Sequence, residues 1–164
     1  MIKLVVLDVD GTLSDGKITY TSNNEEIKSF NVKDGLGIAT WLQLGRKVAI
    51  ITGRNSKIVE NRAKELQITY LKQGIHNKAK ALKEILDHSN ISSDEVAVIG
   101  DDINDLSMIR AVKYSFAPKD CAKPLKKEVY KVLKKRGGEG AVREMIDYLI
   151  KKEKLKKQFY EIFI

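Results

Sequence analysis

Short runs of apolar and β-branched residues alternate along the chain with stretches whose apolar residues recur at helical spacing. The runs "KLVVLDV", "KVAIITG" and "EVAVIGD" are almost continuously apolar, which is typical of strands buried on both faces of a parallel sheet. "TYLKQ" and "YSFAP" are expected to be shorter strands of the same sheet. The pattern predicts an α/β protein.

The segments between these runs are predicted to be helices. "DGLGIATWLQLG" ends at Gly45, "NSKIVENRAKELQI" opens with Asn55 and Ser56 as candidate caps, and "NKAKALKEILDHSN" carries an apolar stripe. From Gly140 onward the pattern predicts one long amphipathic helix. Alternating strands and helices favour a three-layer sandwich with a mostly parallel, Rossmann-like sheet and right-handed crossovers.

The segment "GKITYTSNNEEIKSFNV" breaks this alternation. Ile18 and Tyr20 alternate with polar residues, an Asn-rich turn follows, and Ile27 and Phe30 come after it. Two short strands around such a turn predict a protruding β-hairpin over about residues 16–32 rather than a crossover helix.

The length of 164 residues suits one domain, 1–164, whose C-terminal helix and tail occupy about 140–164. With 43% hydrophobic and 32% charged residues, the composition is typical of a soluble globular protein. Cys121 is the single cysteine, so no intrachain disulfide is expected and a cytoplasmic location fits. The N-terminal apolar run is stopped by Asp8, too early for a signal peptide.

The net charge of +8 raises the question of nucleic-acid binding. Much of the excess lies in "KPLKKEVYKVLKK" and "KKEKLKK", where lysines are interleaved with apolar residues at helical spacing. This spacing indicates the solvated face of a helix, and no zinc-finger or RNA-recognition signature accompanies it. We therefore expect no nucleic-acid partner, and no segment is suited to span a membrane.

Acidic and hydroxyl side chains follow three of the predicted strands where the strands end. Asp8 and Asp10 come after the first apolar run, Thr52 after the second and Asp101 after "VAVIG". Because the carboxyl ends of parallel strands meet at one rim of a sheet, we expect these residues to lie together. Carboxylates at the end of a buried strand repel each other, so a metal cation is the obvious compensating group.

The segment "GDDINDL" adds Asp102 and Asp105, and the loop there could aim Asp101 and Asp105 at one cavity. Hard oxygen ligands select Mg²⁺, and no His/Cys set suggests zinc. His76 and His88 are expected at the surface. Acids alone would also fit a purely structural cation site.

Thr52 and Lys78 favour a catalytic site over a structural one. A hydroxyl and an ammonium have no reason to join a structural cation site, but both suit the oxygens of a phosphoryl group. Lys78 alone would be taken for a surface lysine, because Lys80 and Lys83 belong to the same predicted helix. The combination of residues is what predicts phosphoryl chemistry.

The motifs "DVDGT", "ITGR", Lys78 and "GDDINDL" resemble, in the same order, the four motifs of the haloacid dehalogenase superfamily of phosphotransferases. The resemblance implies that Asp8 is the nucleophile and that Asp10 is first a general acid and then a general base. Thr52 and Lys78 would be the other catalytic residues. The implied Mg²⁺ ligands are Asp8, Asp10 through its backbone carbonyl, and Asp101.

The same resemblance implies where the substrate binds. The candidate substrate-binding residues are Thr52, Gly53, Arg54 and Lys78. Asp105 would hold a metal-bound water or orient Lys78, and Asp102 lies beside it without a defined role. A receiver domain of a response regulator also has an acidic pocket on a doubly wound fold. Its phosphorylated Asp ends a later strand, however, where this chain has Thr52.

No cap domain fits into this chain, because the stretch from Asp10 to Lys33 holds only the hairpin, and the stretch from Gly53 to Lys78 holds one helix and a short strand. "DVDGTLSDG", "FNVKDGLGI", "QGIHNKAKAL" and "RGGEGAVRE" are similar to segments of the 3-deoxy-D-manno-octulosonate 8-phosphate phosphatase family. This resemblance implies a homotetramer whose hairpins meet at the centre, with the C-terminal tail and "RGGEGAVRE" at an interface. It also implies a product used for lipopolysaccharide assembly.

Several alternatives stay open at this point. A sister group that acts on nine-carbon sialic-type sugar phosphates tends to have Glu where this chain has Arg54, and a cation suits the octulosonate carboxylate better. Another small phosphomonoester is the next possibility. A non-catalytic tetramerisation or regulatory module is the contrasting class, and the intact Asp8, Asp10, Lys78 and Asp101 argue against it. Thr12, Ser14 and the lysine-rich tail beyond Leu149 depart from the family pattern.

Overall fold

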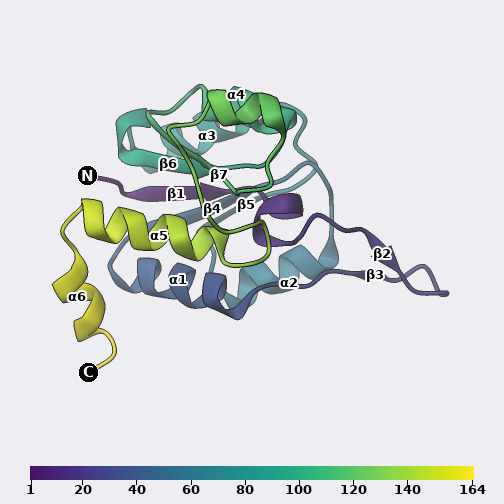
Figure 1. Cartoon of the computed structure of the whole chain (residues 1–164), viewed down its shortest axis with the longest axis horizontal. Helices are drawn as coiled ribbons and strands as arrows, with labels where there is room; N and C mark the ends of the chain where they lie inside the picture. The colour runs from purple at the N-terminus through teal and green to yellow at the C-terminus, as the bar shows by residue number, and fades with distance from the viewer.

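A six-stranded, wholly parallel sheet forms the centre of the molecule in this computed structural model, which describes residues 1–164 (Figure 1). From one edge to the other the strands are β5 (Tyr70–Lys72), β4 (Lys47–Ile51), β1 (Leu4–Leu7), β6 (Val96–Ile99), β7 (Tyr114–Ala117) and β8 (Lys131–Val132). Every residue of β1 and β6 is buried, because helices cover both faces of the sheet. The five predicted strands are confirmed.

Helices pack on both faces, so the predicted three-layer sandwich is also confirmed (Figure 1). One face is covered by α1 (Val32–Gln43), α2 (Lys57–Glu65) and α5 (Ala141–Lys152), and the other by α3 (Lys78–Ser89) and α4 (Leu106–Ile109). Single turns are formed by η1 (Val9–Leu13), η2 (Ser93–Glu95), η3 (Ile103–Asp105) and η4 (Lys123–Lys127). Along β1, Val5 and Leu7 face the first layer while Leu4 and Val6 face the second.

The predicted hairpin is present and projects from one end of the molecule (Figure 1). Its strands, β2 (Thr19–Tyr20) and β3 (Glu26–Ile27), are antiparallel and pair in only two positions. The Thr21 hydroxyl accepts hydrogen bonds from the backbone N–H groups of Asn23 and Glu25, which closes the turn. A pair of strands this short has little stability of its own.

The prediction of helix for "KPLKKEVYKVLKK" is wrong. The segment forms the short turn η4 and then strand β8, which pairs with β7 through Phe116 and Lys131. Pro124 suits only the first turn of a helix, and β-branched and aromatic residues follow at the sheet edge. The Tyr130 N–H donates to the Ser115 hydroxyl, which fixes the entry into the strand. Tertiary pairing therefore overrides the local lysine pattern.

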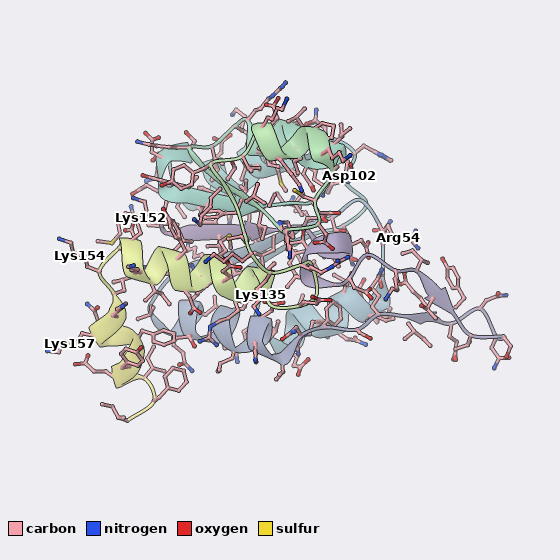
Figure 2. The ribbon with its side chains drawn as sticks, viewed as in Figure 1. Arg54, Asp102, Lys135, Lys152, Lys154 and Lys157 are labelled. Carbon is pink, nitrogen blue, oxygen red and sulfur yellow. The ribbon has the colours of Figure 1, made fainter.

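The single long C-terminal helix is also a wrong prediction, since the segment forms α5 and a separate helix α6 (Lys156–Glu161). Lys154 lies between them with a left-handed φ of +59°, and the next residue, Leu155, is buried in the core below α1 and α5. Burying Leu155 requires the chain to turn. Lys157 is exposed on α6 (Figure 2), whereas Nζ of Lys152 lies over the ring of Tyr114 in β7, 4.7 Å from its centroid. None of the helices is both long and apolar enough to cross a bilayer.

Asp34 joins the hairpin side of the fold to the start of α5. It lies in the first turn of α1, is 1% exposed, and accepts a hydrogen bond from the Arg143 N–H at 2.7 Å. Burial raises the pKa of Asp34 from 3.8 to about 6, while the N–H groups at the start of α5 oppose that rise. The folded chain therefore holds the Asp34 proton more tightly than the unfolded chain does. The free energy of unfolding that this group contributes falls as pH rises from about 4 to about 6.

We expect Asp34→Asn to stabilise the chain more at about pH 7.5 than at about pH 4.5, by about 1–2 kcal/mol, because it removes a buried charge present at the higher pH. Urea unfolding of wild type and variant at both pH values measures this difference. Asp94→Asn, at an exposed position, is the matched control. Equal effects of Asp34→Asn at both pH values would contradict the expectation.

Candidate active site

The end of β1 carries Asp8 into a tight turn. Asp8 is 4% exposed, and its N–H donates to the Ile99 carbonyl, so the pairing with β6 continues past the strand. Gly11, inside η1, has a φ of +93°, which favours glycine. A Cβ at Gly11 would also overlap the carboxylate of Asp101. Glycine therefore serves both the turn and the close approach of Asp101 to the loop.

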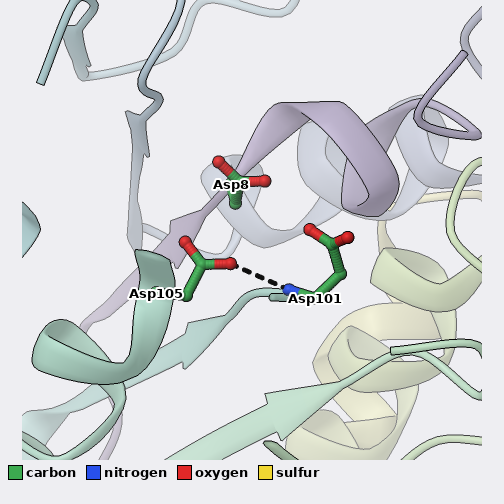
Figure 3. A group of neighbouring side chains, drawn as sticks. All are labelled: Asp8, Asp101 and Asp105. Carbon is green, nitrogen blue, oxygen red and sulfur yellow. Dashed lines mark hydrogen bonds between the residues drawn. The ribbon is translucent and has the colours of Figure 1, made fainter. Parts of the chain in front are cut away.

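Three acids converge at the ends of β1 and β6 (Figure 3). Carboxylate oxygens of Asp8, Asp101 and Asp105 all lie within 4.8 Å of one another. Asp105 is fully buried, and its Oδ2 accepts the backbone N–H groups of Asp101 at 2.9 Å and Asp102 at 3.3 Å. The expected grouping of acids from separate strand ends is thus what the fold produces.

Lys78 lies among these acids as the first residue of α3, and it is 1% exposed. Its Nζ is 2.5 Å from Oδ1 of Asp8 and 2.5 Å from Oδ1 of Asp105. Burial lowers the pKa of Lys78, but the charges of Asp8 and Asp105 raise it more, so the net shift is upward. Lys78 is therefore a buried cation, and of the two roles considered for Asp105 the contacts match the orientation of Lys78.

The cluster holds more negative charge than Lys78 compensates. Burial, and then repulsion from Asp105, raises the pKa of Asp8 to about 6, although Lys78 opposes the rise. Burial, and then repulsion from Asp8 and Asp105, raises the pKa of Asp101 to about 8. A divalent cation with a preference for oxygen would relieve this repulsion, so the donor set fits Mg²⁺. His76 and His88 are exposed, as expected.

Asp10 faces the hairpin, and no carboxylate oxygen of Asp10 belongs to the acid cluster. Its Oδ1 accepts a hydrogen bond from Nζ of Lys28 at 2.5 Å, and the Lys28 side chain is fully buried. Lys28 is not among the residues predicted from the sequence. Because side chains alternate along a strand, Lys28 is expected on the face of the hairpin opposite to Ile27. No sequence pattern shows which loop that face contacts.

The other sequence candidates fall into two groups. Thr52 directly follows β4, which pairs with β1. The residue is 2% exposed, and its hydroxyl makes no hydrogen bond within the chain. Gly53, Arg54 and Asp102 are exposed. Arg54 donates to Tyr20 Oη at 3.2 Å and to Glu26 at 3.4 Å, both in the hairpin.

Asp102 is not brought into the acid cluster. Its Oδ1 accepts the N–H of the next residue, Ile103, at 2.7 Å, so its side chain stabilises the start of η3. Figure 2 shows Asp102 and Arg54 in different parts of the molecular edge, near α4 and near the hairpin. Neither side chain makes a hydrogen bond or an ion pair with Asp8, Asp101 or Lys78.

The motif "RGGEGAVRE", expected at a subunit interface, packs on the turn η1 of its own chain. The Gly138 N–H donates to the Thr12 carbonyl at 3.0 Å, and a Cβ at Gly137 would overlap the Gly11 carbonyl. Asp120 accepts the Gly137 N–H at 3.0 Å and pairs with Arg136. The glycines let this segment support the turn that carries the acids, a contact that the sequence analysis did not anticipate.

A buried acid and lysine at the carboxyl rim of a Rossmann-like sheet, with two further acids after β6, define the chain as a haloacid dehalogenase-like hydrolase. Residues 71–146 match the family model described as haloacid dehalogenase-like hydrolase. The chain is 45% identical over 149 residues to 3-deoxy-D-manno-octulosonate 8-phosphate phosphatase KdsC of Escherichia coli (strain K12), covering 91% of this chain and 79% of that protein. The chain belongs to the 3-deoxy-D-manno-octulosonate 8-phosphate phosphatase family.

Two solved structures agree with this membership. The 3-deoxy-D-manno-octulosonate 8-phosphate phosphatase from Moraxella catarrhalis, in complex with a magnesium ion, a phosphate ion and KDO, is 39% identical, with a TM-score of 0.95 and coverage of 99% of this chain and 94% of that chain. The cobalt-bound phosphatase from Haemophilus influenzae is also 39% identical, with a TM-score of 0.88 and coverage of 92% and 88%.

Proposed function

We propose that this chain hydrolyses 3-deoxy-D-manno-octulosonate 8-phosphate to the free sugar acid and phosphate, in a Mg²⁺-dependent reaction. The observation that carries the proposal is the buried group of Asp8, Lys78, Asp101 and Asp105, in a chain 45% identical to the phosphatase of E. coli. The reaction splits into two displacements at phosphorus, because a carboxylate is a good nucleophile and its acyl phosphate is readily hydrolysed.

In the first displacement Asp8 attacks phosphorus and the bond from phosphorus to the sugar oxygen breaks. Lys78 engages Oδ1 of Asp8, which orients the carboxylate for the attack. Asp10, entering with a proton on its carboxyl group, gives that proton to the leaving sugar oxygen. The products of this step are the free sugar acid and an aspartyl phosphate at Asp8.

In the second displacement Asp10, now ionised, takes a proton from a water molecule as the water oxygen attacks phosphorus. The bond between phosphorus and Asp8 breaks, phosphate leaves, and Asp10 again holds a proton. The Thr52 hydroxyl and Lys78 donate hydrogen bonds to the phosphoryl oxygens. Asp105 keeps Lys78 and the backbone N–H groups of the β6 loop in place throughout.

The residues that would hold Mg²⁺ are Asp8 and Asp101, together with the backbone carbonyl of Asp10. When bound, the ion neutralises negative charge on the phosphate and on Asp8. Both oxygens of Asp105 already accept hydrogen bonds from Lys78 and from backbone N–H groups, so Asp105 acts as an orienting residue instead.

The half-exposed Arg54 is the residue proposed to distinguish substrates. It lies between the hairpin and the end of β4, and a guanidinium there can pair with the carboxylate of a sugar acid. A panel of the octulosonate 8-phosphate, a nine-carbon sialic-type 9-phosphate, a neutral sugar phosphate and an aryl phosphate tests the substrate. The octulosonate ester should have the highest kcat/KM. Absence of phosphate release from every ester, including the aryl phosphate, would instead support a non-catalytic module.

We also propose that the chain works in the cytoplasm, as one domain over residues 1–164, and assembles as a homotetramer through its hairpin and C-terminal tail. Apolar hairpin side chains support the assembly: Ile18 is 39% exposed, Tyr20 56% and Ile27 47%. Exposed apolar residues on a marginal hairpin need a partner surface. Four hairpins at a symmetry axis would provide it and would wall neighbouring active sites that have no cap.

Replacing Ile18 and Ile27 together by aspartate should break the tetramer and lower kcat/KM, although every catalytic residue remains. Charges at these positions repel across a hairpin contact and cannot be buried there without a large desolvation cost. Light scattering with parallel kinetics measures both effects, and Ser22→Asp with Asn23→Asp, at the exposed turn, is the control. A wild-type protein that is monomeric at micromolar concentration and fully active would contradict the assembly.

A further inference from the structure

Lys28 of the hairpin contacts Asp10 in the turn after β1, and Lys28 belongs to none of the motifs predicted from the sequence. Nζ of Lys28 is 2.5 Å from Oδ1 of Asp10 and 3.1 Å from Oε1 of Glu26, and the Lys28 side chain is fully buried. Glu26 is held in turn by the Ser56 hydroxyl, whose Oγ is 2.7 Å from Oε2, and by Arg54. The chain of contacts therefore runs from Asp10 through the hairpin to the end of β4.

We propose that Lys28 is a positioning residue for proton transfer by Asp10. The inference rests on the proposed function, in which Asp10 donates a proton to the leaving sugar oxygen and then removes one from water. The ammonium of Lys28 binds Oδ1 of Asp10 and leaves Oδ2 without a partner in the chain, so Oδ2 is the oxygen open to the leaving group and to water. Fixing the carboxylate in one rotamer keeps Oδ2 aimed at the leaving oxygen and at the attacking water.

The surroundings of Lys28 favour this role over direct substrate binding. Its ammonium already faces two carboxylates, those of Asp10 and Glu26, so little of its charge is free to attract an anionic substrate. Arg54, by contrast, has a side chain that is 46% exposed and is available to a ligand. The Ser56 hydroxyl fixes Glu26, and Glu26 in turn fixes the ammonium of Lys28 where it contacts Asp10. The hairpin thus takes part in the chemistry of its own subunit.

The test compares Lys28→Met with Lys17→Met, an exposed hairpin lysine that pairs only with Asp15. With the sugar phosphate, Lys28→Met should lower kcat about 10- to 100-fold and leave KM nearly unchanged, because binding is kept and proton transfer is misaligned. With an aryl phosphate, whose leaving group needs no proton, the first turnover should stay fast. Slow water activation should then appear as a burst of aryl alcohol close to one equivalent per active site.

A double-mutant cycle with Asp10→Asn supplies the decisive comparison. If Lys28 acts through Asp10, adding Lys28→Met to Asp10→Asn causes no further loss of kcat. Lys28→Arg, which keeps a positive charge beside Asp10, should recover part of the activity. Wild-type kcat in Lys28→Met, an equal loss in the Asp10→Asn background, or Lys28→Arg no better than Lys28→Met would each overturn the proposal.

The same measurements separate this inference from the proposed function. Wild-type turnover in Asp10→Asn would contradict the role of Asp10 itself, whereas an inactive Asp10→Asn with a fully active Lys28→Met would contradict the role of Lys28 alone. Light scattering on each variant checks assembly. If Lys28→Met gives no burst and light scattering shows that its tetramer has dissociated, the role of Lys28 is purely structural. That result would also overturn the proposal.

Discussion

Asp8→Asn is expected to lower kcat by about 10⁴-fold or more, because an amide is a poor nucleophile and no other group can replace the attacking carboxylate. The chain should stay folded. The raised pKa of Asp8, about 6, means that burial and repulsion from Asp105 already disfavour its ionised form. Removing that charge relieves the repulsion, and Lys78 keeps Asp105 as a partner. Melting of the metal-free proteins should therefore show no loss of stability in the variant.

The matched control for Asp8→Asn is Asp102→Asn. Asp102 is exposed and accepts a hydrogen bond from the backbone of its neighbour Ile103, so its replacement should leave kcat near the wild-type value. Trapping the aspartyl phosphate with acid during turnover should label wild type and Asp102→Asn but not Asp8→Asn. A well-folded Asp8→Asn protein with wild-type turnover would contradict the covalent mechanism.

Chelation of divalent metal is expected to abolish turnover, and added Mg²⁺ is expected to restore it while Ca²⁺ is not. Without a cation, the acids at the ends of β1 and β6 repel both one another and the incoming phosphate. Ca²⁺ has longer bonds and more ligands than Mg²⁺, so it would displace Asp8 relative to phosphorus. Phosphate release measured before and after dialysis against chelator tests this. Full activity in excess chelator would contradict it.

The affinity for Mg²⁺ should rise with pH between about 6 and 8. In the metal-free chain the pKa of Asp8 is raised to about 6 and that of Asp101 to about 8, so these acids hold protons that a cation must displace. Calorimetric titration at about pH 6 and about pH 8 should show binding about 100-fold tighter at the higher pH, with proton release. Asp101→Asn should lose most of this pH dependence, and a pH-independent wild-type affinity would contradict the account.

The sequence by itself determined the layered architecture and most of the chemistry. Runs such as "KLVVLDV" have no polar face, so they have to be buried on both sides, and strands of that kind belong to parallel sheets. Parallel sheets bring their carboxyl ends to one rim, which is why Asp8 and Asp101, 93 positions apart in the sequence, could be placed in one site. Both inferences follow from burial and periodicity, which are local properties.

The errors in predicting elements arose where tertiary contacts outweighed local pattern. Leu155 interrupts the C-terminal helix because its burial in the core stabilises the chain more than another helical turn would. The lysine-rich segment before Arg136 becomes strand β8 because the edge of β7 offers backbone partners, among them the pairing of Phe116 with Lys131. A short window of sequence indicates neither which residues reach the core nor which strand edge is left to pair.

The contacts between the hairpin and the active site were also decided only by the tertiary structure. Nothing local distinguishes Lys28, bound to Asp10, from exposed lysines such as Lys17, because its burial depends on where the hairpin folds back. Arg54 was expected to face substrate, and its present partners, Tyr20 and Glu26, come from that same hairpin. Periodicity assigns a side chain to one face of an element, whereas the packing of elements decides what that face meets.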